Sequence, residues 1–176
     1  AIALAAFHLA QSNSDTTMLV LPADHVIDDQ ETFTQAVETA AIAAQHGYLV
    51  TFGISPHSPE TGYGYIKIGD SVELTKPAQL SIYQIQSFCE KPQLETAQAY
   101  LQQGGYLWNS GMFVFTAGNY LQQLQRHRPD IYTAAKQAWQ QRTTDLGFVR
   151  PNREIFTTCP SESIDYAIMQ TTDQAV

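Results

Sequence analysis

The strand–helix–strand order of the first third of the chain restricts its fold more than any other feature. Residues 18–21 form a short apolar run, Met-Leu-Val-Leu, which is typical of a buried strand. Apolar positions at helical spacing follow over residues 33–44, after a capping-box-like start at Asp28, and Gly47 fits the end of this helix. Residues 48–53 have the pattern of the next strand. This βαβ order predicts a mixed, mainly parallel sheet covered by helices in a three-layer α/β/α fold.

Length and charge limit the class of protein. With 176 residues and 44% apolar composition, the chain is long enough for one domain with a real core, assigned to residues 1–176. The net charge is −8, and no basic residue occurs before Lys67, so the basic footprint of a nucleic-acid-binding protein is absent. No apolar run approaches the roughly 20 residues that span a bilayer. We therefore expect neither a nucleic-acid nor a membrane partner.

The two cysteines, Cys89 and Cys159, lack metal-type spacing and do not form a disulfide framework. Such sparse cysteine usage suits a reducing compartment, so we expect a cytoplasmic protein.

An acid and a base lie side by side in residues 88–92, Phe-Cys-Glu-Lys-Pro, which follow the apolar run of residues 80–85. Neighbours on a strand point to opposite faces, but at a strand end a kinked backbone lets both reach one crevice. A carboxylate such as Glu90 can hold sugar hydroxyls, and an ammonium such as Lys91 can hold a phosphate. Taken alone, this motif also fits a solvated turn ended by Pro92.

Asp24 follows the carboxyl end of the first strand, the edge where open α/β sheets bind ligands. It could be one of the one or two protein carboxylates that Mg²⁺ usually takes beside phosphate oxygens, or simply a helix-cap or turn residue.

Three further positions have a functional and a structural interpretation. Gly64, in Gly-Tyr-Gly-Tyr, permits close approach of a ligand to the backbone, or marks a bulge. Asn109, in Trp-Asn-Ser-Gly, can donate to and accept from sugar hydroxyls, or form a turn before the strand of residues 112–115. Asp165 lies in the first turn of an expected helix that Ser161 or Ser163 would cap, which suits the helix dipole.

Taken together, the motifs resemble the mannose-1-phosphate guanylyltransferase family, the bacterial GDP-mannose pyrophosphorylases. They occur in the family's order and with similar spacing over nearly the whole chain, at residues 21–25, 62–66, 88–92, 108–113 and 163–167.

The resemblance implies a Rossmann-like nucleotidyltransferase fold and the Mg²⁺-dependent reaction of mannose 1-phosphate with GTP to give GDP-mannose and pyrophosphate. By motif, it implies that Asp24 binds the metal and that Lys91 binds the sugar phosphate. Gly64, Glu90 and Asn109 would contact the mannose, and Asp165 would lie near the sugar or support the site. In-line attack of a phosphate on the α-phosphorus of GTP needs positioning and charge stabilisation more than covalent help from the protein.

The chain also departs from the family pattern. It has no glycine before Gly47 and no basic residue before Lys67, so the family's Gly-rich nucleotide loop is missing. The family's second metal aspartate and C-terminal β-helical domain would fall beyond Val176. We therefore expect a fragment, incomplete at both ends and inactive by itself, whose exposed sheet edge favours a homo-oligomer that sedimentation can test.

Two alternatives stay open. One is a nucleotidyltransferase for another sugar 1-phosphate such as glucose 1-phosphate. The other is a non-catalytic sugar-phosphate-binding or assembly module, which the missing nucleotide loop favours.

Overall fold

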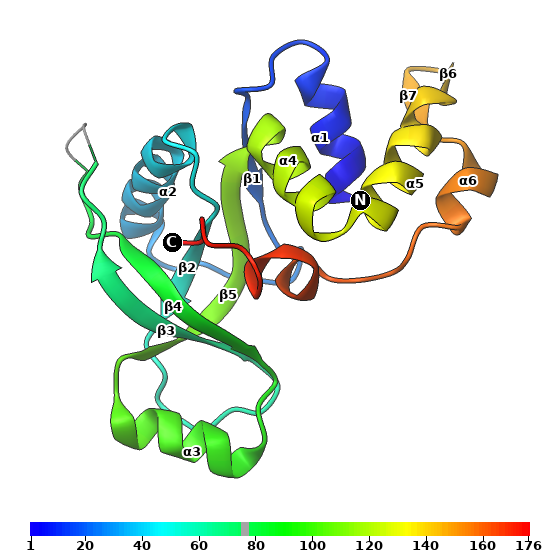
Figure 1. Ribbon diagram of the computed structural model, residues 1–176. Helices are drawn as coiled ribbons and strands as arrows, with labels where there is room; N and C mark the ends of the chain where they lie inside the picture. The colour runs from blue at the N-terminus through cyan, green and yellow to red at the C-terminus, as the bar shows by residue number, and fades with distance from the viewer. Residues whose placement is uncertain (75–77) are drawn as a thin grey trace. The chain divides into compact units, whose positions relative to one another are not determined.

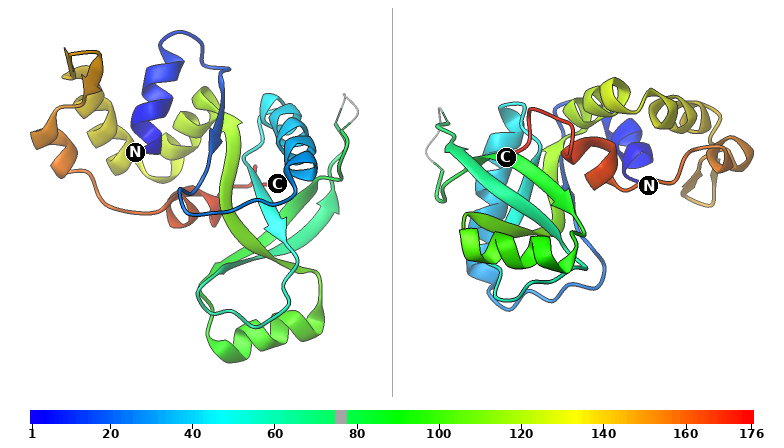
Figure 2. Two further views of the ribbon diagram at one scale, coloured as in Figure 1. Left: turned by 180° about the vertical axis from the view of Figure 1, so that it is seen from behind. Right: turned by 60° about the horizontal axis from the view of Figure 1, so that its bottom comes forward.

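The chain packs as two groups of residues in the computed structural model, which describes residues 1–74 and 78–176 (Figures 1 and 2). Unit 1 comprises residues 1–18 and 116–172, and unit 2 comprises residues 19–115 and 173–176. This division concerns packing, and the single nucleotidyltransferase domain expected over residues 1–176 stays a prediction.

The sheet is the framework of unit 2. Its strands run in the order β1-β5-β3-β4, with β2 paired to β5, and are β1 (Thr17–Val20), β2 (Val50–Ile54), β3 (Gly64–Ser71), β4 (Tyr83–Glu90) and β5 (Tyr106–Thr116). The expected mixed α/β fold is confirmed. The expectation that parallel pairs predominate is wrong for the ladders β2–β5, β3–β5 and β3–β4, which are all antiparallel. The reason is that β2 pairs with β5, which comes later in the chain, so the strands joined by the first crossover are not neighbours.

The last residues of the chain supply a parallel contact. Ala175 forms a parallel bridge with Leu49, and the backbone N–H of Thr51 donates to the carbonyl of Val176 at 2.9 Å. On the other side, the N–H of Ile85 donates to the carbonyl of Ala175 at 3.1 Å. The end of the chain thus lies between β2 and β4 and fixes the backbone of β2 at Thr51.

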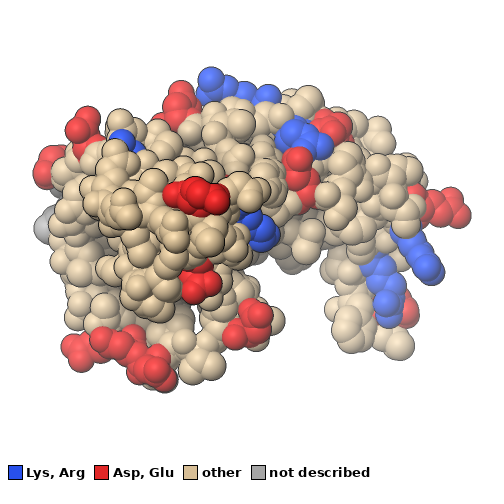
Figure 3. Space-filling model, turned by 90° about the horizontal axis from the view of Figure 1, so that it is seen from below, with Lys and Arg blue, Asp and Glu red and all other residues tan. Residues whose placement is uncertain are grey.

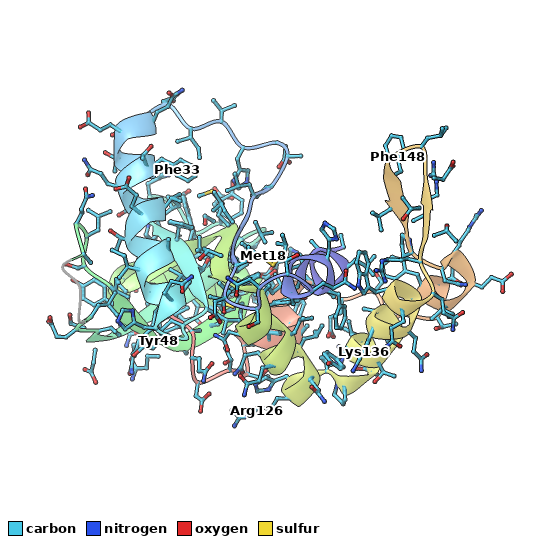
Figure 4. All side chains as sticks on the ribbon, turned by 90° about the horizontal axis from the view of Figure 1, so that it is seen from above. Met18, Phe33, Tyr48, Arg126, Lys136 and Phe148 are labelled. Carbon is cyan, nitrogen blue, oxygen red and sulfur yellow. The ribbon has the colours of Figure 1, made fainter. Side chains whose placement is uncertain are left out.

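Two helices of unit 2 cover separate apolar clusters. The α2 helix (Gln30–Gln45) carries Phe33 (Figure 4) and packs near β2, where the ring of Phe52 lies 6.3 Å from that of Phe33. The α3 helix (Leu94–Gln103) ends before Gly104. The buried residues of the first cluster are Ala40, Ala43, Ala44, Val50, Ile82, Val114 and Val176, and those of the second are Tyr65, Ala97 and Trp108.

The start of α2 differs by one residue from the expectation. Asp29, and not Asp28, is the N-cap, and its carboxylate accepts from the backbone N–H of Thr32 at 3.0 Å and from the Thr32 hydroxyl at 2.6 Å. These hydrogen bonds, the side-chain one foremost, hold the pKa of the Asp29 carboxyl below its ordinary value. Gly47, expected at the end of this helix, has a φ of +89°, a conformation that glycine adopts readily.

We expect Asp29→Ala to lower the thermal midpoint of unfolding at neutral pH, because the helix loses its cap. A carboxyl whose pKa is lowered in the folded state stabilises the fold above its unfolded pKa, and this contribution disappears as the pH falls through the folded value. The difference between wild type and variant should therefore shrink below about pH 4. Asp28→Ala is the matched control, and equal losses at neutral pH in the two variants would contradict the assignment.

Strand β1 is less buried than its apolar composition predicts. Met18 is buried, but Leu19 is 41% exposed and Leu21, just past the strand, is 47% exposed. β1 stands at one end of the strand order, which leaves it with fewer covering neighbours than an inner strand. The association of copies through a sheet edge stays a prediction.

Unit 1 is mainly helical. Its elements are α1 (Ile2–Ala10), α4 (Ala117–His127), α5 (Pro129–Gln140), the hairpin β6 (Thr143–Asp145) with β7 (Phe148–Arg150), α6 (Arg153–Thr157) and the π-helix η1 (Asp165–Met169). Phe148 lies on the hairpin and is 64% exposed (Figure 4). Among the described residues, no helix has both the length and the apolarity that crossing a membrane requires.

The expected cap of the last helix is wrong. The N-cap of η1 is Ile164, without a side-chain cap bond, and Ser163 contributes its backbone carbonyl, which accepts from the N–H of Ala167 at 2.9 Å. A π-helical turn replaces the α-helix expected there, so the capping geometry of an α-helix does not apply.

Candidate active site

The antiparallel pairing of β3 with β4 brings the first two predicted sugar-binding residues together. Gly64 opens β3 and pairs directly with Glu90, the last residue of β4. A methyl group added at Gly64 would collide with Oε2 of Glu90 and lie 3.3 Å from Cβ of Asn109. Gly64, Glu90 and Asn109, which are far apart in sequence, are therefore neighbours. The glycine is needed here because the Glu90 carboxylate occupies the space of its missing side chain.

Lys91 completes the acid–base pair. It follows the end of β4 with a φ of +49°, a left-handed conformation that is uncommon for a residue with a side chain. Its backbone N–H donates to the carbonyl of Tyr63 at 3.2 Å. Its ammonium lies 3.2 Å from Oε1 of Glu90; the Lys91 side chain is 60% exposed, whereas that of Glu90 is 11% exposed. The kink expected at this strand end is thus confirmed, and it places a solvent-facing cation beside a largely covered anion.

Asn109 lies inside β5, so the turn expected before this strand is instead an irregularity within it. From Thr51 to Gly53, β2 advances two residues, whereas β5 advances four, from Asn109 to Phe113. Gly111 has a φ of +71°, and its N–H donates to Oδ1 of Asn109 at 3.3 Å. Bulges of this kind redirect side chains and occur often beside active sites. The Asn-Ser-Gly sequence is therefore a bulge within β5, and this bulge orients Asn109.

Trp108 is a core residue within an aromatic cluster. It is 6% exposed, and the rings of His57 and Tyr63 contact it edge-on at centroid distances of 4.8 and 5.2 Å. This aromatic cluster adjoins Gly64 and Asn109 in sequence through Tyr63 and Trp108. Trp108 is therefore part of the core, and His57, which is distant from it in sequence, joins the cluster only through tertiary packing.

Asp24 occupies an exposed loop after β1. This loop approaches the bulge, since a methyl group added at Gly111 would lie 3.8 Å from Cγ of Pro22. In the described part of the chain, no group of three or more His, Cys, Asp and Glu side chains could hold a metal ion. Asp24 fits only a Mg²⁺ ion that takes one protein carboxylate and fills its other positions with phosphate oxygens and water.

Two further positions from the sequence motifs are not part of this group within unit 2: Asp165 belongs to unit 1, and Gly62 has no close neighbour where a side chain would be. Asp165 is the first residue of η1, in unit 1, and is partly exposed there. Gly62 has open space where a side chain would be, so only Gly64 of the two glycines is constrained by its surroundings.

Sequence reasoning missed Thr51, whose hydroxyl lies 2.8 Å from Oδ1 of Asn109. A buried-strand pattern gives no sign of this contact, because it joins residues that are 58 positions apart.

Fold and site together define an α/β protein with a carboxylate, an ammonium and an amide gathered around one glycine. The chain matches the family model for nucleotidyl transferases over residues 1–153. It belongs to the nucleotidyl transferase family.

Individual relatives of the chain support the same family. Over its whole length the chain is 50% identical to mannose-1-phosphate guanylyltransferase of Escherichia coli (strain K12) and 48% identical to the xanthan biosynthesis protein XanB of Xanthomonas campestris pv. campestris (strain B100). It spans only 37% and 36% of the length of these relatives. The family resemblance carried by the sequence motifs is confirmed.

Solved structures show the same fold. A crystal structure of mannose-6-phosphate isomerase from Helicobacter pylori has a TM-score of 0.85 and 32% identity, covering 99% of this chain and 65% of its own. One of mannose-1-phosphate geranyltransferase from Thermus thermophilus has a TM-score of 0.76 and 32% identity, covering 97% of this chain and 45% of its own.

Proposed function

We propose that the chain provides the sugar-phosphate-binding part of a mannose-1-phosphate guanylyltransferase. The observation that carries the proposal is the convergence of Gly64, Glu90, Lys91 and Asn109 in unit 2. The names of several relatives support mannose 1-phosphate, and not glucose 1-phosphate, as the sugar.

Each side chain has a role that its chemistry supports. The 11%-exposed Glu90 carboxylate accepts hydrogen bonds from sugar hydroxyls, and Asn109 supplies an amide to the same ring. The Lys91 ammonium, held near Glu90 but 60% exposed, attracts the phosphate. Glu90 also partly neutralises Lys91 when no ligand is bound, so phosphate binding exchanges one anionic partner of the lysine for another.

In the proposed reaction, a phosphate oxygen of mannose 1-phosphate attacks the α-phosphorus of GTP. A new O–P bond forms as the bond to the β-phosphate breaks, and pyrophosphate leaves with the electron pair. The residues of this chain hold the attacking group, and orienting it is the main contribution a protein can make to such a step. Asp24 would hold Mg²⁺, which would offset the charge of the phosphates when bound.

The charge distribution favours a small anion over a polyanion. The net charge is −8. On the face shown in Figure 3, basic side chains of the described residues lie singly or in small groups among acidic ones. We also propose a cytoplasmic location, supported by the free thiols of Cys89 and Cys159.

We expect isothermal titration calorimetry to show that Lys91→Ala binds mannose 1-phosphate about tenfold more weakly than wild type, because one charge-assisted contact is lost. Lys136→Ala, which removes the same charge from α5, is the matched control and should leave the affinity unchanged. Equal affinity of wild type and Lys91→Ala would contradict the site. Equal affinity of the wild type for glucose 1-phosphate would favour the alternative sugar.

A further inference from the structure

Thr51 contacts the bulge of β5 that carries Asn109. Thr51 lies on β2 opposite the irregular part of β5, pairs with Phe113, and is only 9% exposed. Its hydroxyl lies 2.8 Å from Oδ1 of Asn109 and 3.0 Å from the carbonyl oxygen of Met112. These two acceptors stand on either side of Gly111. The single proton of the Thr51 hydroxyl can be donated to either acceptor, so this hydroxyl contacts both ends of the bulge.

The contact determines which end of the Asn109 amide meets a ligand. Oδ1 accepts from the Thr51 hydroxyl and from the N–H of Gly111, so it is committed to the bulge. An asparagine amide has one acceptor oxygen and one donor nitrogen. With the oxygen held in this way, a polar contact of Asn109 with a sugar is made by Nδ2 as the donor.

The backbone around Thr51 is itself fixed. Its N–H donates to the carbonyl of Val176 at 2.9 Å, and its register opposite Phe113 places it at the edge of the bulge. The hydroxyl is therefore a rigid element, and not a flexible surface group, which is the property that a positioning residue needs.

We propose that Thr51 is a positioning residue that sets the rotamer and amide orientation of Asn109 and thereby determines which sugar hydroxyls the site accepts. This inference rests on the proposed function, since it assigns sugar recognition to Asn109. Its role differs from a packing role because the hydroxyl, and not the methyl group, is required.

The test compares Thr51→Val, which keeps the shape and removes the hydroxyl, with Thr51→Ser, which keeps the hydroxyl. We expect Thr51→Val to bind mannose 1-phosphate about tenfold more weakly and to lose most of its preference over glucose 1-phosphate. Thr51→Ser should keep that preference. Thr39→Val is the matched control, because Thr39 is 4% exposed, belongs to the same unit, and its hydroxyl has no hydrogen-bond partner among the described residues.

A second measurement reports on the orientation of the Asn109 side chain in the absence of any ligand. The side-chain amide signals of Asn109 in a ¹H–¹⁵N spectrum, identified by their loss in Asn109→Asp, should shift and exchange faster with water in Thr51→Val but not in Thr51→Ser. An unchanged sugar preference in Thr51→Val, or an equal loss in Thr51→Ser, would overturn the proposal. If the wild type does not bind mannose 1-phosphate, the proposed function fails, while the amide signals still decide whether Thr51 orients Asn109.

Discussion

We expect Gly64→Ala to weaken the binding of mannose 1-phosphate by roughly 10- to 100-fold, the loss associated with one or two hydrogen bonds to a charged group. The added methyl group would collide with Oε2 of Glu90, whereas its next contacts, Cβ of Asn109 and Cε1 of Phe88, lie at 3.3 Å. The carboxylate is the end of a flexible side chain, so it moves and the backbone stays. Binding should be lost because Glu90 would leave the position in which we propose that it contacts the sugar.

The variant should remain folded, which separates this effect from unfolding. Gly64 does not have a positive φ, so alanine can adopt its backbone conformation. Gly62→Ala is the matched control, since no atom lies within 4 Å of its added methyl group. Calorimetry with mannose 1-phosphate, beside a thermal melt of each variant, provides the measurement. If Gly64→Ala binds mannose 1-phosphate with wild-type affinity, the assignment of Glu90 to the sugar site is wrong.

The proximity of the candidate site residues follows only in part from the sequence. Glu90 and Lys91 are adjacent in the chain, so a kink at the strand end suffices to bring them together, and the φ of Lys91 is +49°. Gly64 joins them through β-pairing, which depends on the register of two strands 26 residues apart, from Gly64 to Glu90. The bulge at Asn109 depends on both β2 and β5, and single-strand patterns do not contain that information.

The difference between local and long-range information also explains which expectations about the fold are wrong. Helix α2 follows from local spacing and a local cap, and only its N-cap is displaced, from Asp28 to Asp29. The direction of strand pairing is not local. A strand–helix–strand pattern shows that two strands run in the same direction, but not whether a third, antiparallel strand such as β5 is their neighbour in the sheet.

The largest loss of stability is expected from Tyr65→Ala. Tyr65 is fully buried beneath α3, beside Ala97 and Trp108, and its ring lies 5.4 Å from that of Tyr100. Removing a buried aromatic ring from a close-packed cluster forfeits its transfer free energy and leaves a cavity. We expect the free energy of unfolding of unit 2 to fall by about 3–5 kcal/mol.

The variant Tyr65→Phe separates the contribution of the ring to stability from that of its hydroxyl. The hydroxyl donates to the carbonyl of Ser58 at 3.5 Å, a long hydrogen bond, so its removal should lower the free energy of unfolding by about 1 kcal/mol or less. Tyr83→Ala is the exposed control on β4, with 43% of the side chain accessible.

The unfolding of unit 2 can be followed separately by tryptophan fluorescence, because Trp108 belongs to unit 2 and Trp139 to unit 1. In a Trp139→Phe background, the fluorescence of Trp108 during urea denaturation reports on unit 2 alone. Because Tyr65 and Trp108 pair across β3 and β5 next to Gly64 and Asn109, the Tyr65→Ala cavity should also loosen the proposed sugar site. If the urea midpoint of Tyr65→Ala is close to that of Tyr83→Ala, the cluster around Tyr65 does not stabilise unit 2.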